Sequence, residues 1–198
     1  MLVVPADAAL DQVSAWISAG DVAALVLNLG DAPAPDAARL GALAAAGQAR
    51  GVAVLLDGPV PIAEAAGMDG VHVADPARLP AILKALKSNG QSGPLVGVGG
   101  LSGRHAAMEA GEAGADYLMF GARDGADFAT ACDLVSWWAD LFEVPCVGLA
   151  TTPEAVAAFA AAGADFVALA PGLLGQDGAV AQAQRLITPA PAAMDIPG

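Results

Sequence analysis

Two aspartates stand just after apolar runs of the sequence and could act together as ligands of a cation. Asp57 follows the apolar residues 52–56, and Asp75 comes shortly after the next run, at residues 70–73. Mg²⁺ prefers oxygen ligands and is commonly held by one or two carboxylates together with phosphates of a substrate. Asp57 and Asp75 are therefore candidates for a magnesium site. The segment Asp57-Gly58-Pro59 is also typical of a simple turn, and this structural interpretation stays open beside the chemical one.

A second set of residues has the chemistry needed to hold a phosphate. Thr151 and Thr152 offer hydroxyl groups, and Gly172 opens a stretch whose backbone N–H groups could face an anion. Gly99 and Gly100 follow another apolar run and would let the backbone approach a ligand closely. The alternative is purely structural, with the threonines capping a helix and the glycines forming turns.

Three more polar side chains are candidates for chemistry. Ser102 could contact a substrate or cap the helix that follows it, and Arg123 could bind an anion or pair with its neighbour Asp124. We take Ser102 and Arg123 as the candidate catalytic residues. His72 lies inside an apolar run and is flanked by valines, so its side chain faces the side opposite to theirs. We expect His72 to be a hydrogen-bonded interior histidine rather than a proton shuttle.

The elements that would position these residues are eight short apolar runs, each followed by a segment with helical spacing. Continuous apolar strands are typical of a parallel sheet that is covered on both faces. Asp75-Pro76 is a plausible start for the clearest helical segment, although Pro80 predicts that the regular helix begins only near that residue. The predicted strands span residues 2–4, 23–27, 52–56, 70–73, 95–98, 117–120, 145–149 and 166–169.

A repeat in the sequence supports this count. Glycines at positions 20, 67, 114 and 163 each follow an alanine and precede an apolar run, and the last three belong to the pattern Ala-Gly-x-Asp. We expect each of these glycines to end a helix in the left-handed conformation. A spacing of just under fifty residues is about twice the length of a compact strand–helix unit, so the repeat marks every second unit.

Eight such units in 198 residues predict a minimal (β/α)₈ TIM barrel, an α/β fold in a single domain. We place the barrel over residues 1–187 and a frayed C-terminal tail over residues 188–198. An open doubly wound sheet is the alternative, but it would not explain a fourfold period. Barrel enzymes carry their chemistry at the carboxyl ends of the strands. The polar residues and glycines at or just after these ends are Asp7, Asn28, Gly30, Asp31, Asp57, Gly58, His72, Asp75, Gly99, Gly100, Ser102, Gly121, Arg123, Asp124, Thr151, Thr152 and Gly172.

Composition excludes several classes of function. The 8 Lys and Arg residues against 21 Asp and Glu residues give a formal net charge of −13, which disfavours nucleic acids and anionic membranes as partners. No apolar run approaches the roughly 18 residues that span a bilayer, and the start of the sequence lacks the charged region of a signal peptide. Cys132 and Cys146 fit neither a disulfide framework nor a zinc site. We therefore expect a cytoplasmic protein that handles a small molecule.

Several of these segments, taken in order, are similar to thiamine-phosphate synthases and their thiazole tautomerase relatives. The resemblance rests on Asp-Gly-Val-His at residues 69–72, Val-Gly-Val at 96–98, Ala-Asp-Tyr-Leu-Met-Phe-Gly at 115–121 and Ala-Gly-Ala-Asp at 162–165. It covers nearly all of residues 1–187. It implies a TIM barrel that uses Mg²⁺ to join a pyrimidine pyrophosphate to a thiazole phosphate, with Asp57 matching a metal-binding aspartate of the family.

The sequence departs from the family pattern at several other positions. The resemblance places the second metal carboxylate near Asp75, but Ala77 occupies roughly the matching place, and Ser102 substitutes for a family Ser or Thr that aligns near Gly99. The family's cations after the second strand have no counterpart in residues 26–31, and its lysine after the sixth strand and its Gly-Gly after the seventh are also missing. The histidine of the tautomerase branch is absent as well. By analogy with oxyanion holes, each lost donor would cost about 2.7–4 kcal/mol of transition-state stabilisation.

Three functional hypotheses follow. The first is a thiamine-phosphate synthase-like enzyme that binds Mg²⁺ through Asp57 and a phosphate through the loops after strands seven and eight, as a monomer or a homo-oligomer. The second is a degenerate relative that binds a phosphorylated small molecule without catalysis. The third is a partner-binding protein with Trp137 and Trp138 as an exposed anchor, although two such tryptophans on a helix are more typical of packing against the barrel.

Overall fold

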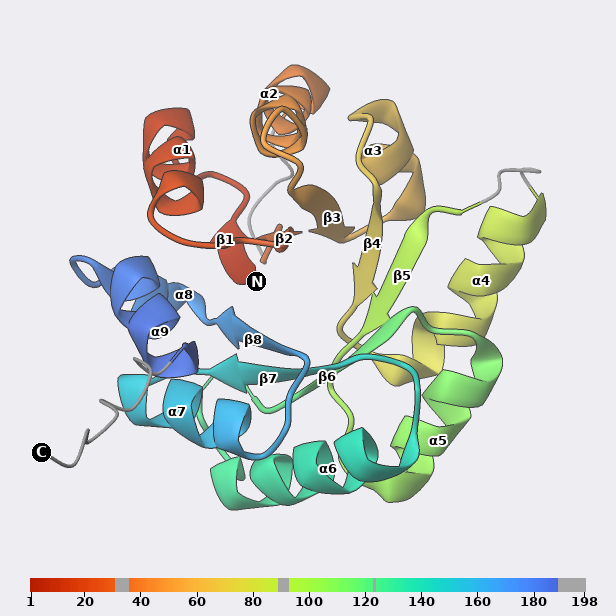
Figure 1. Cartoon of the computed structure of the whole chain (residues 1–198). Coiled ribbons are helices and arrows are strands. Elements are labelled where there is room, and N and C mark those ends of the chain that lie inside the picture. The colour runs from red at the N-terminus through yellow and green to blue at the C-terminus, as the bar shows by residue number, and fades with distance from the viewer. Residues whose placement is uncertain (31–35, 89–92, 123, 189–198) are drawn as a thin grey trace, which may run out of the picture.

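In the computed structural model, which describes residues 1–30, 36–88, 93–122 and 124–188, eight parallel strands close into a barrel in chain order. Figure 1 shows the strands at the centre with the helices arranged around them. Pairing of Leu2 with Leu169 joins the first strand to the last. The strands are β1 Leu2–Pro5, β2 Ala24–Asn28, β3 Ala53–Asp57, β4 Gly70–Val73, β5 Leu95–Val98, β6 Tyr117–Phe120, β7 Cys146–Ala150 and β8 Phe166–Leu169. The predicted TIM barrel is confirmed.

The helices cover the outside of the barrel and connect its strands. They are α1 Leu10–Ser18, α2 Ala37–Gln48, α3 Val60–Ala65, α4 Leu79–Ser88, α5 Arg104–Ala113, α6 Phe128–Leu141, α7 Pro153–Ala161, α8 Pro171–Leu174 and α9 Ala179–Ile187. Asp75 caps a short 3₁₀ turn, η1 (Pro76–Arg78), and the regular helix α4 begins only at Leu79, as Pro80 predicted. Within the described ranges, no helix is long and apolar enough to cross a membrane.

Alternation along each strand divides the core into two layers. Val3, Val26 and Met119 belong to a cluster inside the barrel, whereas neighbours such as Leu2 and Leu25 pack between the sheet and the helices. Both layers need apolar side chains, because each strand is covered on both faces. This double burial is the physical reason for the low charge content of the chain.

The repeated Ala-Gly-x-Asp pattern builds the amino-terminal end of the barrel, opposite the ends where chemistry is expected. Gly67, Gly114 and Gly163 have positive φ angles and end helices, as predicted. The prediction was wrong for Gly20, which is absent from the positive-φ residues of the described chain and instead lies against Val180 of α9, where a Cβ would come within 3.1 Å. Gly20 therefore allows close helix packing and does not form a left-handed turn.

The aspartate of this pattern ties β4, β6 and β8 each to the strand before it. The Asp69 carboxylate accepts a hydrogen bond from the Val54 N–H (2.7 Å), Asp116 accepts one from Val96 (2.7 Å), and Asp165 accepts one from Cys146 (2.8 Å). Each carboxylate thus satisfies a backbone donor at the start of a strand. The repeat is a structural device of the barrel and lies outside its functional end.

This role predicts a loss of stability when the carboxylate is removed. Asp116→Ala should lower the free energy of unfolding by about 1.5–3 kcal/mol, because it removes a charged acceptor and leaves the Val96 N–H without its bond. Urea unfolding followed by circular dichroism measures this loss. Asp116→Asn is the matched control and should lose less, since its side chain keeps a carbonyl oxygen. Equal stability of Asp116→Ala and the unmodified protein would contradict the assignment.

Candidate functional site

A polar layer crosses the inside of the barrel, from the last residues of β2 and β3 to the first residue of β6. Strand register places Asn28 beside Asp57, Asp57 beside His72, His72 beside Gly97, and Gly97 beside Tyr117. Asn28 donates a hydrogen bond from Nδ2 to Asp57 Oδ2 at 2.6 Å, and His72 Nδ1 lies 2.9 Å from the Tyr117 hydroxyl oxygen. Strands β2, β3, β4 and β6 thus bring an amide, a carboxylate, an imidazole and a phenol into one layer, and β5 contributes Gly97 between the last two.

Tyr117 is accommodated in this layer because the residue beside it has no side chain. A Cβ on Gly97 would collide with the Tyr117 ring. The ring also stacks on the imidazole of His72, with 5.8 Å between centroids and an interplanar angle of 16°. Burial, followed by the nearby charge of Asp57, raises the pKa of Tyr117 well above its ordinary value. The phenol is therefore protonated at physiological pH.

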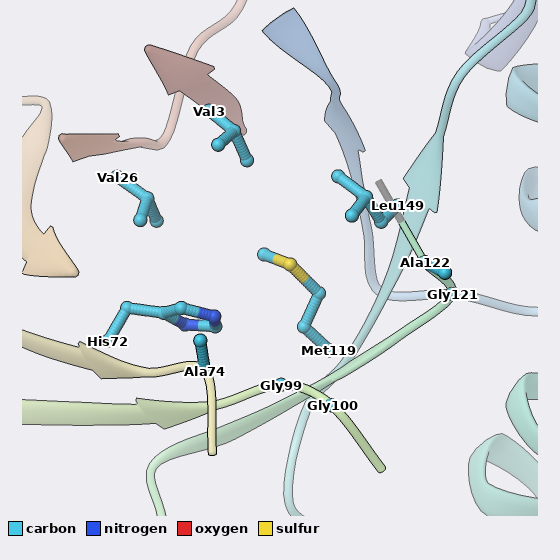
Figure 2. A pocket seen from close by; sticks show the side chains of 10 residues that line it. All are labelled: Val3, Val26, His72, Ala74, Gly99, Gly100, Met119, Gly121, Ala122 and Leu149. Carbon is cyan, nitrogen blue, oxygen red and sulfur yellow. The ribbon is translucent and has the colours of Figure 1, made fainter. Parts of the chain in front are cut away.

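Above this layer, the mouth of the barrel holds a cavity of about 190 Å³. Figure 2 shows the side chains of His72 and Met119 pointing into the space bounded by Val3, Val26 and Leu149. A second cavity of about 240 Å³ lies beside it and shares Gly100, Gly121 and Ala122 with the first. Each cavity alone is below the usual size of a drug-sized ligand site, roughly 300–1,000 Å³, so a larger ligand would occupy both.

The two predicted metal ligands lie after neighbouring strands but in different surroundings. Asp57 is half-buried and faces the barrel interior beside Asn28. Asp75 is exposed, and its Oδ1 accepts a hydrogen bond from the Ala77 N–H in the cap of η1. Among the described residues, no three Asp, Glu, His or Cys side chains converge in a way that could hold a metal. Mg²⁺ usually takes only one or two carboxylate ligands from the protein, because water and the phosphates of a substrate supply the others.

Three of the predicted phosphate-binding residues lie in the loops after the last two strands. Thr151 and Thr152 follow β7, and Gly172 follows β8. Thr151 is half-buried, and Gly125 approaches it so closely that a Cβ there would lie 2.9 Å from the Thr151 hydroxyl. Thr152 caps α7, since its Oγ1 accepts a hydrogen bond from the Ala155 N–H at 3.2 Å. Gly172 is exposed on the four-residue helix α8. The capping interpretation is thus confirmed for Thr152, and a ligand role remains a prediction for Thr151 and Gly172.

Glycines 99 and 100 form part of the cavity wall, and Ser102 lies in the neighbouring cavity. Gly100 has a φ of +67°, and a Cβ there would collide with the carbonyl oxygen of Ala74. Ser102 lines the second cavity and does not cap α5, whose N-cap is Gly103 with no side-chain bond. The capping prediction for Ser102 was wrong because α5 begins one residue later than expected. The other candidate catalytic residue, Arg123, lies outside the described residues.

Positive charge is scarce around these cavities. None of their described lining residues is Lys or Arg. Arg39, in the first turn of α2, donates hydrogen bonds from Nη2 to the carbonyl oxygens of Asp7 (2.6 Å) and Ala8 (3.0 Å). Its guanidinium therefore holds the loop after β1.

The paired tryptophans of α6 pack within the molecule. Trp138 is 1% exposed and donates a hydrogen bond from Nε1 to the Val144 carbonyl oxygen at 2.7 Å. Trp137 is half-buried, lies edge-on to Phe142, and has the guanidinium of Arg104 at 5.0 Å from its ring centroid. The packing interpretation is therefore favoured over an exposed anchor. The free thiol of Cys146 is buried, and burial raises its pKa to about 11.

Tyr117 is the part of this site that the sequence alone did not reveal. It stands at the start of a predicted strand, directly after an Ala-Asp pair, and was not selected as a site residue. Alternation puts residues 117, 119 and 121 on one face of β6, but it does not say which face points inward. The register across Gly97, which places Tyr117 beside His72, exists only once the barrel has closed.

Comparisons with known sequences show which family the chain resembles. Residues 1–173 match a family model described as thiamine monophosphate synthase. The chain is 39% identical over 173 residues to a thiamine-phosphate synthase of Rhodospirillum centenum, covering 81% of this chain and 80% of the relative. It is 33% identical over 183 residues to one of Hyphomonas neptunium, covering 85% and 80%.

Solved structures support the fold. A thiamine phosphate pyrophosphorylase from Pyrococcus furiosus superposes with a TM-score of 0.75 at 17% identity, covering 94% of each chain. A geranylgeranylglyceryl phosphate synthase from Thermoplasma acidophilum gives a TM-score of 0.62 at 14% identity, covering 94% of this chain and 90% of the other. At these identities the likeness concerns the fold alone.

Proposed function

The chain belongs to the thiamine monophosphate synthase family, and on that premise we propose that it joins a pyrimidine pyrophosphate to a thiazole phosphate at the carboxyl-terminal mouth of its barrel. The observation that carries this proposal is the family match over residues 1–173, together with relatives named thiamine-phosphate synthase that are matched over four-fifths of their length. Asn28, Asp57 and the paired cavities lie at the end of the barrel where enzymes of this fold do their chemistry.

In this proposal each part of the mouth has a separate task. Asp57, with Asp75 as second carboxylate, would hold Mg²⁺, which would neutralise the charge that develops on the departing pyrophosphate. Asn28 orients the Asp57 carboxylate through the 2.6 Å hydrogen bond. Thr151 and the backbone of Gly172 would bind the monophosphate, and Gly99 and Gly100 let the ligand lie against the backbone. Ser102 and Arg123 would contact the reacting groups.

A second candidate function is binding without catalysis. The observation that favours it is the lack of Lys and Arg among the described residues that line the two cavities. Pyrophosphate departure depends on preorganised positive charge, so a mouth without cations would retain a phosphorylated molecule more readily than it would cleave one. The net charge of −13 also opposes strong binding of a pyrophosphate.

Thermal-shift and turnover measurements separate the two candidates. The protein would be combined with the thiazole phosphate, with the pyrimidine pyrophosphate plus Mg²⁺, and with inorganic pyrophosphate, and then assayed for thiamine phosphate. Turnover supports the enzyme, and stabilisation by the monophosphate without turnover supports the binding protein. A protein that no compound stabilises and that shows no turnover would contradict both.

Two neighbouring threonines give a matched pair for the phosphate subsite. Thr151→Val should weaken binding of the thiazole phosphate about tenfold, the effect of one lost hydrogen bond to a charged group, with little change in stability. Thr152→Val should instead lower the free energy of unfolding by about 1 kcal/mol, because it removes the cap of α7. Isothermal titration and urea unfolding measure the two effects, and unchanged affinity in Thr151→Val would remove this residue from the phosphate site.

A further inference from the structure

Met119 has the longest flexible side chain in the wall of the first mouth cavity. It is 3% exposed and belongs to the apolar cluster inside the barrel. Alternation along β6 turns Met119 inward, whereas its two neighbours on the strand pack toward the helices. Figure 2 shows its thioether extending from β6 into the space between His72, Val3 and Leu149. The conformation of this one side chain therefore limits how much of the barrel interior is open to a ligand.

The rest of the wall of this cavity is almost entirely apolar. Val3, Val26 and Leu149 are buried, and among the described residues that line the cavity only His72 has a polar side chain. The imidazole of His72 is itself packed against the backbone of Gly99, where a Cβ would lie 2.9 Å from Nε2. A wall of this kind recognises a ligand mainly by removing apolar surface from water.

The volume of the cavity suits a single ring. The cavity measures about 190 Å³, and an apolar cavity of about 150 Å³ in another protein is large enough to bind benzene. A five- or six-membered heteroaromatic ring with small substituents therefore fits. A ring with a longer side arm has to displace the Met119 side chain, which reaches into the same space.

A phosphate is unsuited to this cavity. A phosphate monoester carries a charge of about −1.5 to −2 at neutral pH, and burying an unpaired charge is costly. Within the described part of the chain, the cavity wall includes neither Lys nor Arg. The charged group of a ligand therefore lies outside the cavity, in contact with water or with the loops of the mouth, while its ring enters.

We propose that the first mouth cavity binds one uncharged heteroaromatic ring, and that Met119 is the specificity-determining residue that limits the size of this ring and its substituents. The thioether contacts the bound ring, an arrangement that sulfur and aromatic rings favour. The identity of the ring as the pyrimidine or the thiazole rests on the proposed function, whereas the preference for a single uncharged ring does not.

Carbon-13 labelling of the methionine ε-methyl groups tests the contact directly. The chain has five methionines, and the signal that Met119→Leu removes belongs to Met119. Met108 is exposed on α5 and serves as the internal control. Methylthiazole and methylpyrimidine, which carry no phosphate, are the probes, because an aromatic ring shifts the signals of nearby nuclei. At least one of them should move the Met119 signal and leave the Met108 signal in place, and inorganic phosphate should move neither.

The same signals distinguish this proposal from the proposed function. Turnover to thiamine phosphate with a Met119 signal that no ring compound moves would overturn the ring contact and leave the function intact. Movement of the signal by an uncharged ring, in a protein that neither binds nor converts the phosphorylated compounds, would support the ring contact and contradict the function. Movement with the phosphorylated compounds alone would show that recognition depends on the phosphate, and would overturn the proposal. A signal that nothing moves, without turnover, would overturn both.

Truncation of Met119 tests its control over ring size. Met119→Ala should raise the affinity for propylthiazole relative to methylthiazole about tenfold or more, because one methylene in an apolar pocket changes discrimination by about 10–200-fold. Met108→Ala, the matched surface variant, should leave this ratio unchanged. Ligand-observed NMR titration measures the ratio, and circular dichroism shows whether each variant is folded. Met119→Val, a smaller truncation, replaces an alanine variant that does not fold. An unchanged ratio in a folded Met119 variant would contradict the proposal.

Discussion

Replacing Asp57 by asparagine should lower turnover to thiamine phosphate by at least about 100-fold while the barrel stays folded. The variant removes the half-buried carboxylate that we propose as a magnesium ligand, and removing one preorganised electrostatic group from an active site costs roughly 10²–10³ in rate. Asparagine keeps a side-chain oxygen that can still accept the hydrogen bond from Asn28. The loss should therefore appear in catalysis and in the magnesium dependence, with little change in the free energy of unfolding.

Asp75→Asn tests the second proposed carboxylate in the same experiment. Asp75 is exposed and caps η1, and asparagine caps as well as aspartate does. If Asp75 is the second metal ligand, its variant should show a weakened magnesium dependence like that of Asp57→Asn. If Asp75 only caps the turn, its turnover should stay within about twofold of the unmodified protein. Full activity of Asp57→Asn at low magnesium would refute the metal site itself.

Replacing Trp138 by alanine should cost about 3–5 kcal/mol of stability, the range for removing a large aromatic side chain from a core. The Trp138 ring stacks on Phe142 with centroids 4.0 Å apart, and it packs against Gly111, where a Cβ would lie 2.9 Å from the indole. The hydrogen bond from Nε1 to Val144 is lost as well. Urea unfolding followed by circular dichroism measures the change without relying on tryptophan fluorescence.

Trp137→Ala provides the comparison, because Trp137 is a neighbour of the same type but is only half-buried. It should cost less than about half as much as Trp138→Ala, since less apolar surface leaves water when Trp137 packs. Equal losses in the two variants would contradict the difference in burial. A Trp137→Ala variant with full stability would revive the interpretation of this residue as a surface anchor.

Much of the fold could be predicted because the signals that specify it are local. The β3 run predicted at 52–56 lies at Ala53–Asp57 in the structure, and the β8 run matches at 166–169. Helix ends could be predicted from single residues as well, since Pro80 delays the start of α4 and Gly114 ends α5. The prediction failed at Gly20, where the glycine packs closely against α9, an element about 160 residues away in the chain.

The candidate site was predicted less completely. Residues that follow a strand could be selected from the sequence, and Asp57 and His72 were found in this way. Asn28 was selected in the same way, but its pairing with Asp57 was not predicted, and Tyr117 was missed. The two bonds join residues 29 and 45 positions apart, so no local pattern reveals them. Ser102 was misassigned as a cap for a similar reason, since a shift of one residue at a helix start depends on how the loop packs.

The sequence by itself determined that this chain is a parallel barrel with little positive charge, because strand alternation, helix ends and composition act over a few residues each. Only the tertiary structure decided which polar side chains meet. Register across the closed barrel places Asn28, Asp57, His72 and Tyr117 in one layer, and it does so because strands far apart in the chain become hydrogen-bonded neighbours. The tertiary structure also shows what lines the mouth in place of the family's cations. The described wall of the first mouth cavity consists of backbone, one imidazole and apolar side chains, whereas the family resemblance implied positive charge.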